Sequence, residues 1–175
     1  MGLMRNIVVV EYSPEWPAAF EREAASLRPA LGAALREFHH IGSTSVPGLA
    51  AKPVIDMLAV VADLAALDAR DPFLLELGYT PKGEFGIAGR RFYSKGADDA
   101  RTHHLHAFAE GHASITRHFD FRDYLRAHPE AAAHYGALKQ RLAAENREEI
   151  EVYLAGKAGF IEELLAKAQA WRAGA

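Results

Sequence analysis

One aspartate interrupts the most apolar run of the chain. In PVIDMLAVV, which begins at Pro53, Asp56 is the only charged side chain. A carboxylate inside an apolar strand is costly unless it is paired with a cation, hydrogen-bonded or bound to a metal. Asp56 is therefore the first candidate for chemistry, and the alternative is a structural ion pair with Lys52 or with an arginine.

Two histidines in a second strand-like run offer further donor atoms. In THHLHAF, the two-residue alternation of a strand places His104, His106 and Phe108 on one face. Together with Asp56 from a neighbouring strand, the two imidazoles form a set that suits a single divalent ion. We predict that Asp56, His104 and His106 are the catalytic residues and the ligands of a divalent metal, Mg, Mn or Zn. The alternative is that the histidines hydrogen-bond to a ligand, to Asp56 or to water and hold no metal.

A turn rich in glycine and hydroxyl groups lies shortly before the apolar run. Gly42 permits a close backbone approach. The three residues after it carry hydroxyls beside backbone N–H groups: Ser43, Thr44 and Ser45. We predict that residues 42–45, with Lys52 within reach, bind the phosphates of a nucleotide or of another phosphorylated small molecule. The alternative is an ordinary connection between strands, because Gly and Ser are common in turns.

An arginine follows a glycine-rich stretch, GEFGIAG, that could fold over a ligand as a lid. If Phe92 points into the core, then Arg91, Tyr93 and Lys95 share the other face of the strand GRRFYSKG. Arg91 is accordingly the predicted anion ligand of this strand. On the C-terminal helices we expect charged residues to serve packing and ion pairs, with Lys139 pointing into a cleft beside the sheet as the alternative.

The histidines outside the run THHLHAF divide into two groups. His39 and His40 flank the turn and are further candidates for the site. The others lie in polar, helix-like surroundings and are expected at the surface: His112, His118, His128 and His134.

Gly42-Ser43 followed by Asp56 in an apolar strand resembles the signature of the DNA polymerase beta-like nucleotidyltransferase superfamily. Several longer blocks, in this order, are similar to the GrpB-like family within that superfamily: VEYSPEWPAAF, HIGSTSVPGLAAKPVIDML, HHLHAF, FRDYLRAHPEAAAHYGALK and YLAGKAGFI. The resemblance implies that Gly42 and Ser43 hold a nucleoside triphosphate and that Asp56 is one of the acids that hold two divalent metals. The second acid would fall at Leu58, which cannot bind a metal.

Three functions follow from these residues. The first is nucleotidyl transfer from a nucleoside triphosphate to a hydroxyl acceptor with a divalent metal. The second is a non-catalytic module that binds a nucleotide or phosphorylated metabolite. The third is a metal-dependent phosphohydrolase, in which an ion at His104 and His106 activates water.

The elements that must position these residues indicate an α+β fold. Strand-like runs alternate with helices in residues 1–113, beginning with NIVVVEY, and predict a mixed or antiparallel sheet covered on one side by helices. Residues 114–175 predict three C-terminal helices, separated at His128-Pro129 and at Gly156, packed on this nucleotidyltransferase-like core as a single compact unit.

Composition limits the partners. Lys and Arg number 20 against 23 acidic residues, for a net charge of −3, so a nucleic-acid partner is not expected. The chain has no cysteine and no apolar run long enough for a membrane span, from which we expect no membrane partner and a cytoplasmic location.

Overall fold

The computed structural model describes residues 7–146 and 149–174. Its strands are β1 Leu35–Ile41, β2 Ile55–Val61, β3 Tyr79–Pro81, β4 Arg90–Ala97 and β5 Ala100–Ala109. Its α-helices are α1 Trp16–Leu31, α2 Leu64–Asp68, α3 Asp71–Glu76, α4 Ala113–Ala127, α5 Pro129–Glu145 and α6 Ile150–Gly174. Two short 3-10 turns, Gly32–Ala34 and Ser43–Ser45, flank β1.

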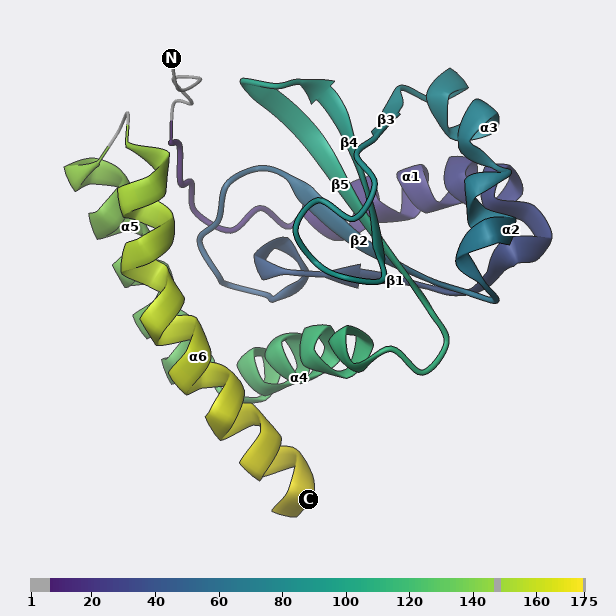
Figure 1. Ribbon diagram of the computed structural model, residues 1–175. Helices are drawn as coiled ribbons and strands as arrows, with labels where there is room; N and C mark the ends of the chain where they lie inside the picture. The colour runs from purple at the N-terminus through teal and green to yellow at the C-terminus, as the bar shows by residue number, and fades with distance from the viewer. Residues whose placement is uncertain (1–6, 147–148, 175) are drawn as a thin grey trace.

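The five strands form one mixed sheet in the order β1-β2-β5-β4-β3. Only β2 and β5 are parallel, and the other neighbours are antiparallel. Helices α1, α2 and α3 pack on one face of the sheet, and α4 packs on the opposite face. Figure 1 shows α5 and α6 at the left, beside the sheet. The predicted α+β class with a mixed sheet and a C-terminal helical segment is confirmed.

The alternation predicted for the two parallel strands is also confirmed. The apolar residues of one face pack in the main core with α1, α2 and α3: Ile55, Met57, Ala59, Val61, Leu105 and Ala107. The opposite face therefore carries Asp56, His104 and His106, on two strands that are directly hydrogen-bonded to each other.

Leu58, at the position of the missing second acid, is fully buried. It packs with Ile41 and Phe108 under Ile115 and Phe119 of α4. Helix α4 thus seals this part of the sheet with apolar side chains, and the polar site begins only at Asp56.

The N-terminal strand predicted from NIVVVEY is wrong over the described residues. Residues 7–11 form only one isolated bridge, Val10 with Ala51, and Asn6 lies outside the described part of the chain. Helix α1 begins at Trp16, after a turn in which Ser13 accepts a hydrogen bond from the Glu15 amide. It ends at Leu31, and the C-cap residue Gly32 has a φ of +57°.

Three C-terminal helices are present, but the predicted break at Gly156 is wrong. Helix α5 ends at Glu145, and Gly156 lies inside α6. A Cβ at Gly156 would lie 2.8 Å from Cδ2 of Leu142, so this glycine allows α5 and α6 to approach closely. No helix in the described ranges is long and apolar enough to cross a membrane.

Candidate functional site

Asp56, His104 and His106 come together, as the alternation of the strands predicts. Oδ1 of Asp56 lies 3.4 Å from Nδ1 of His104 and 3.4 Å from Nε2 of His106. The parallel register places Asp56 directly beside His104, and Leu58 beside His106. The regular sheet therefore positions all three polar side chains.

The neighbours of the two imidazoles indicate that the proton is on Nε2 in His106 and on Nδ1 in His104. Nη1 of Arg90 lies 3.4 Å from Nδ1 of His106, and because arginine can only donate, this nitrogen is an acceptor and Nε2–H donates to Asp56. His104 faces Asp56 with Nδ1, so its proton is assigned there. Nε2 of His104 is buried and has no hydrogen-bond partner among the residues described.

Asp56 is held in its ionised form. Burial opposes ionisation, but hydrogen bonds from His104 and His106 outweigh it and hold the pKa of the Asp56 carboxyl well below its usual range. Gly42 packs against this carboxylate, since a Cβ at Gly42 would lie 2.8 Å from Oδ2. Its φ of +71° is a second reason for glycine at this position.

The hydroxyl-rich turn has an internal structure of its own. Thr44 is hydrogen-bonded to Nε2 of His40 at 2.9 Å, and the Ser45 hydroxyl donates to the carbonyl of Gly42. Ser43 and Thr44 line the cavity described next. The first amide groups of a helical turn have no hydrogen-bond partner inside the turn itself. The predicted phosphate turn therefore lies at the site, with two of its three hydroxyl residues on the cavity wall.

His40 and His39 do not line the cavity. The ring of His40 stacks on Phe20 of α1 at 4.9 Å, on the core side of the sheet. Burial lowers its pKa to about 4, so it supports Thr44 as a neutral ring. His39 lies against Phe119 of α4.

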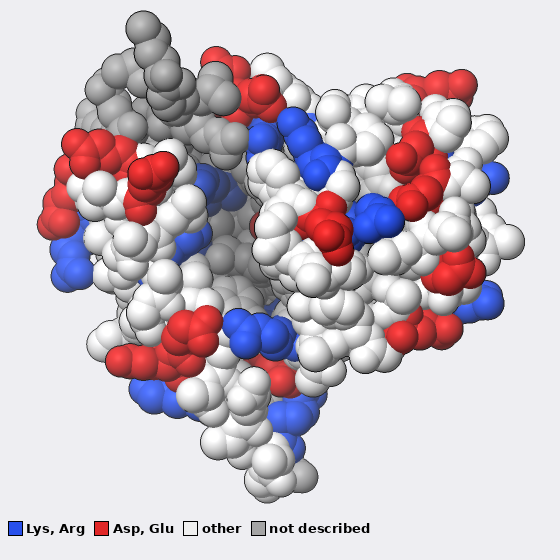
Figure 2. Space-filling view, in the orientation of Figure 1, with Lys and Arg blue, Asp and Glu red and all other residues white. Residues whose placement is uncertain are grey.

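A cavity of about 490 Å³ lies between the sheet and helices α5 and α6. Figure 2 shows this hollow, with Lys and Arg atoms on its wall. Its cationic lining residues are Lys52, Arg90, Arg101, Lys139 and Lys157. Within the described part of the chain Asp56 is the only acidic residue of the lining, and Arg101 also pairs with Asp98 at 3.6 Å.

Two lysines of this wall are unusual. Lys139 is only 2% exposed, and its Nζ lies 4.5 Å from the ring centroid of Tyr135. Burial lowers the pKa of Lys139 to about 7 and that of Lys157 to about 8. No described carboxylate lies within ion-pair distance of either ammonium. Nζ of Lys157 lies 5.0 Å from the ring of Tyr153, and Nζ of Lys52 lies 5.1 Å from the same ring.

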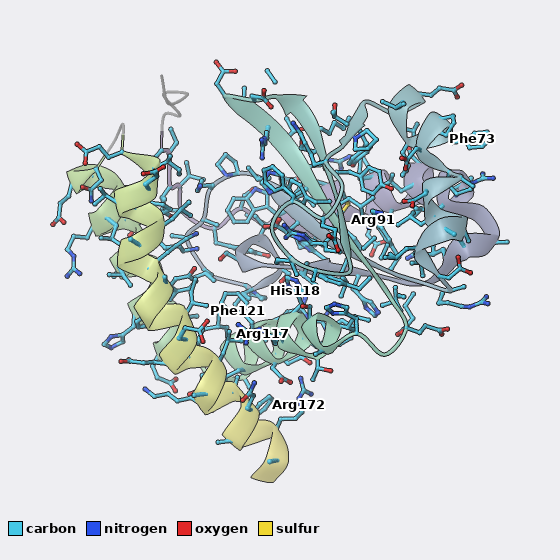
Figure 3. All side chains as sticks on the ribbon, in the orientation of Figure 1. Phe73, Arg91, Arg117, His118, Phe121 and Arg172 are labelled. Atoms are coloured by element: carbon cyan, nitrogen blue, oxygen red, sulfur yellow. The ribbon has the colours of Figure 1, made fainter. Side chains whose placement is uncertain are left out.

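The prediction that Arg91 faces the ligand is wrong. Its guanidinium donates to both carboxylate oxygens of Asp68, at 2.8 and 3.1 Å, on the side of α2 (Figure 3). Tyr93, not Phe92, is the core residue of this strand, so the face assignment shifts by one residue. Arg90 occupies the cavity wall instead and is 7% exposed.

Sequence analysis also missed His118 and the residues supplied by α6. His118 extends from α4 toward the sheet (Figure 3), with its ring 5.3 Å from that of His106, and burial lowers its pKa to about 4. Tyr153 and Lys157 are four residues apart on one helix face. That spacing was the only available signal, and it does not tell which face meets the sheet.

The residues do not fit the pair of metals that the resemblance implies. Asp56 has no second acid beside it on β2, because Leu58 occupies that position and is buried under α4. Asp56, His104 and His106 carry donor atoms that suit a single ion such as Zn²⁺, but they are hydrogen-bonded to one another. In the described ranges no group of three or more His, Cys, Asp or Glu side chains is arranged to hold a metal. Ligation of one ion by these three residues stays a prediction.

Comparison with known proteins gives close relatives. The model of the GrpB protein family matches residues 6–167. UPF0157 protein YqkA of Bacillus subtilis is 44% identical over 170 residues, which are 97% of this chain and 49% of that protein, so the chain spans about half the length of this relative.

The chain is also similar to a solved structure of the same family. The crystal structure of conserved protein GrpB from Enterococcus faecalis is 41% identical, with a TM-score of 0.88 over 94% of this chain and 99% of that chain. The Cid1 poly(U) polymerase bound to Mg and 3'-dATP aligns with 75% of this chain and 44% of its own, at 13% identity. Its TM-score of 0.49 is too low to establish a shared fold.

Proposed function

The chain belongs to the GrpB protein family, and on this basis we propose that it binds a nucleoside triphosphate or another phosphorylated metabolite in the cavity between the sheet and helices α5 and α6. The charge of the cavity wall is the observation that carries this proposal. Three cationic side chains of this wall, Arg90, Lys139 and Lys157, have no described carboxylate within ion-pair distance. A ligand with several negative charges balances these cations, whereas a neutral or cationic ligand does not.

Lys139 gives this proposal its strongest support. A buried ammonium without a carboxylate partner is costly to the folded state. A phosphate oxygen supplies the missing charge, and it raises the lowered pKa of Lys139 again when it binds. The Ser43–Thr44 turn and Arg90 line the same cavity and offer hydrogen-bond donors to further phosphate oxygens.

We further propose nucleotidyl transfer to a hydroxyl acceptor, with His104 as the general base. The acceptor oxygen attacks the α-phosphorus, the bond from that phosphorus to the leaving pyrophosphate breaks, and Nε2 of His104 takes the hydroxyl proton. Asp56 holds the ring in the required tautomer through Nδ1–H, as a carboxylate does in hydrolytic triads. No hydrogen bond among the described residues uses the lone pair of Nε2, which leaves this nitrogen available for the role.

A thermal-shift panel tests binding. The four ribonucleoside triphosphates and inorganic tripolyphosphate are each titrated into the protein, and binding raises the melting temperature with ligand concentration. Lys139→Met should reduce the shift. Lys167→Met, on the exposed face of α6, should leave it unchanged.

Two outcomes separate the proposals. No shift with any phosphate compound contradicts binding in the cavity. A clear shift, without release of pyrophosphate in the presence of a panel of hydroxyl acceptors, retains binding and contradicts transfer.

A further inference from the structure

An aromatic ring stands exposed at the mouth of the cationic cavity. Phe85 is 54% exposed and lines the cavity from the glycine-rich loop at 82–89. One face of its ring stacks on Phe92, with centroids 5.0 Å apart and planes 12° apart. Its exposed surface leaves room for a second planar partner.

The backbone holds Phe85 in this position against its own preference. Its φ of +47° is the only positive value among the described residues other than glycine. Such a conformation is unfavourable for a residue other than glycine and is retained where the surroundings enforce it. Arg90 enforces it here, because Nε donates to the carbonyl of Glu84 at 3.1 Å and Nη2 donates to the carbonyl of Phe85 at 2.6 Å.

A continuous set of aromatic rings connects Phe85 to Asp56, His104 and His106. The ring of Phe92 lies under Phe85 and meets His104 and His106 edge-on, at 5.2 Å each. Arg90, which fixes the backbone of Phe85, also contacts Nδ1 of His106. A planar group on Phe85 is therefore placed on the sheet side of the cavity, close to Arg90 and to the two histidines.

The mouth and the floor of the cavity differ in polarity. Ile87 and Leu154 are 38% and 44% exposed and line the mouth together with Phe85. The cations lie among the other lining residues. An apolar, aromatic mouth beside a cationic floor matches a molecule with a flat, weakly polar end and a phosphorylated end.

We propose that Phe85 is the stacking platform for a nucleobase and is the residue that makes the site specific for nucleotides over other phosphorylated metabolites. This inference rests on the proposed phosphate binding and narrows its substrate class. Stacking uses the π face that every base has, so Phe85 selects for the presence of a base and not for its identity.

Calorimetry with two probes tests the inference, since tripolyphosphate carries the charge without the base and ATP carries both. In Phe85→Leu we expect ATP binding to weaken about five- to tenfold, the effect of one lost stacking contact, and tripolyphosphate binding to stay as in the wild type. Phe73→Leu is the matched control, because Phe73 is also an exposed phenylalanine but lies on α3 (Figure 3), outside the cavity lining. It should change neither affinity.

Two further variants separate recognition from fold stability. Phe85→Gly removes the strained conformation, so it should retain or raise the melting temperature and still weaken ATP binding. Phe85→Trp keeps an aromatic face, and its added fluorescence should be quenched by ATP but not by tripolyphosphate, with the wild type as the blank.

The outcomes distinguish this inference from the proposal beneath it. If tripolyphosphate binds and ATP binds equally well to wild type and Phe85→Leu, the platform is refuted while phosphate binding stands. If neither probe binds, phosphate binding fails and the platform fails with it. If Phe85→Leu weakens both probes equally, the residue serves the shape of the cavity, and base recognition is refuted.

Discussion

Nδ1 of His104 lies 3.4 Å from Oδ1 of Asp56, while Nε2 of the same ring is buried without a hydrogen-bond partner among the described residues. The parallel register of β2 and β5 sets the two residues side by side, so the arrangement is part of the sheet and does not depend on a loop. It joins the one charged residue of an apolar strand to Nδ1 of an imidazole whose other nitrogen, Nε2, has no hydrogen-bond partner among the described residues.

Replacing Asp56 by Asn should separate chemistry from binding. The amide cannot hold His104 in the same tautomer, so we expect nucleotidyl transfer to fall by about 10³-fold or more. Phosphate affinity should stay or increase, because the variant removes the one described carboxylate of the cavity lining. Pyrophosphate release and the Kd for ATP are the two measurements. Asp68→Asn, at the Arg91 pair outside the cavity, is the control. Transfer at the wild-type rate in Asp56→Asn contradicts the proposed role of Asp56 in orienting His104.

The same carboxylate should make stability depend on acid pH. Its pKa is lowered in the folded state, because hydrogen bonds from His104 and His106 outweigh burial. A group of this kind stabilises the fold above its unfolded pKa of about 3.9, and this contribution is lost as the pH falls below that value. We expect the free energy of unfolding, measured in urea between about pH 6 and pH 3, to decrease less steeply in Asp56→Asn than in the wild type. Equal slopes contradict a stabilising pair of hydrogen bonds.

Phosphate binding should weaken as the pH rises. Burial lowers the pKa of Lys139 to about 7 and that of Lys157 to about 8 in the free protein. Both are charged below these values and lose charge above them, so affinity for tripolyphosphate should decrease from pH 7 to pH 9. Calorimetry at pH 8 should also show proton uptake from the buffer on binding. Lys139→Met should reduce the dependence of tripolyphosphate affinity on pH. An unchanged pH dependence in this variant contradicts a role of Lys139 in phosphate binding.

Gly42 and Gly48 provide a matched pair of substitutions. Both have positive φ, +71° and +80°, so alanine adds backbone strain at both positions, and at Gly42 ψ is −171°, a combination essentially limited to glycine. Only at Gly42 does the new Cβ meet Asp56, at 2.8 Å from Oδ2, whereas nothing lies within 4 Å at Gly48. We expect Gly42→Ala to lower the free energy of unfolding more than Gly48→Ala and to weaken phosphate binding as well. Equal effects of the two variants on both measurements contradict the contact between the turn and the carboxylate.

The sheet and the centre of the site could be predicted because strand alternation is a local property. The faces of β2 and β5 follow from residue spacing alone, and these faces bring Asp56, His104 and His106 together. A tight turn at Gly42 was predictable from the conformational freedom of glycine, while phosphate binding by this turn stays a prediction. These features depend on neighbouring residues in the sequence, so they can be predicted without knowledge of tertiary packing.

The cationic wall could not be predicted in full, because it is assembled from distant segments. In β4, two aromatic residues compete for the core. Tyr93 occupies it with its hydroxyl bound to Asp71 at 2.7 Å, which turns Arg90 inward and Arg91 outward. Lys157 comes from α6, and the packing of α6 on α4 and α5 brings it to the cavity. That packing depends on Gly156, which a single sequence shows as a helix breaker and not as a close contact.

Titration calorimetry of tripolyphosphate in the presence of a chelator tests phosphate binding by the cavity cations with the fewest assumptions. If the lysines of α5 and α6 form the binding wall, the wild type should bind one equivalent without added metal. The double variant Lys139→Met/Lys157→Met should then bind about 100-fold more weakly, the effect of two lost charge-assisted contacts, and Lys167→Met should match the wild type. No binding in chelator, or equal binding by the wild type and the double variant, would contradict it.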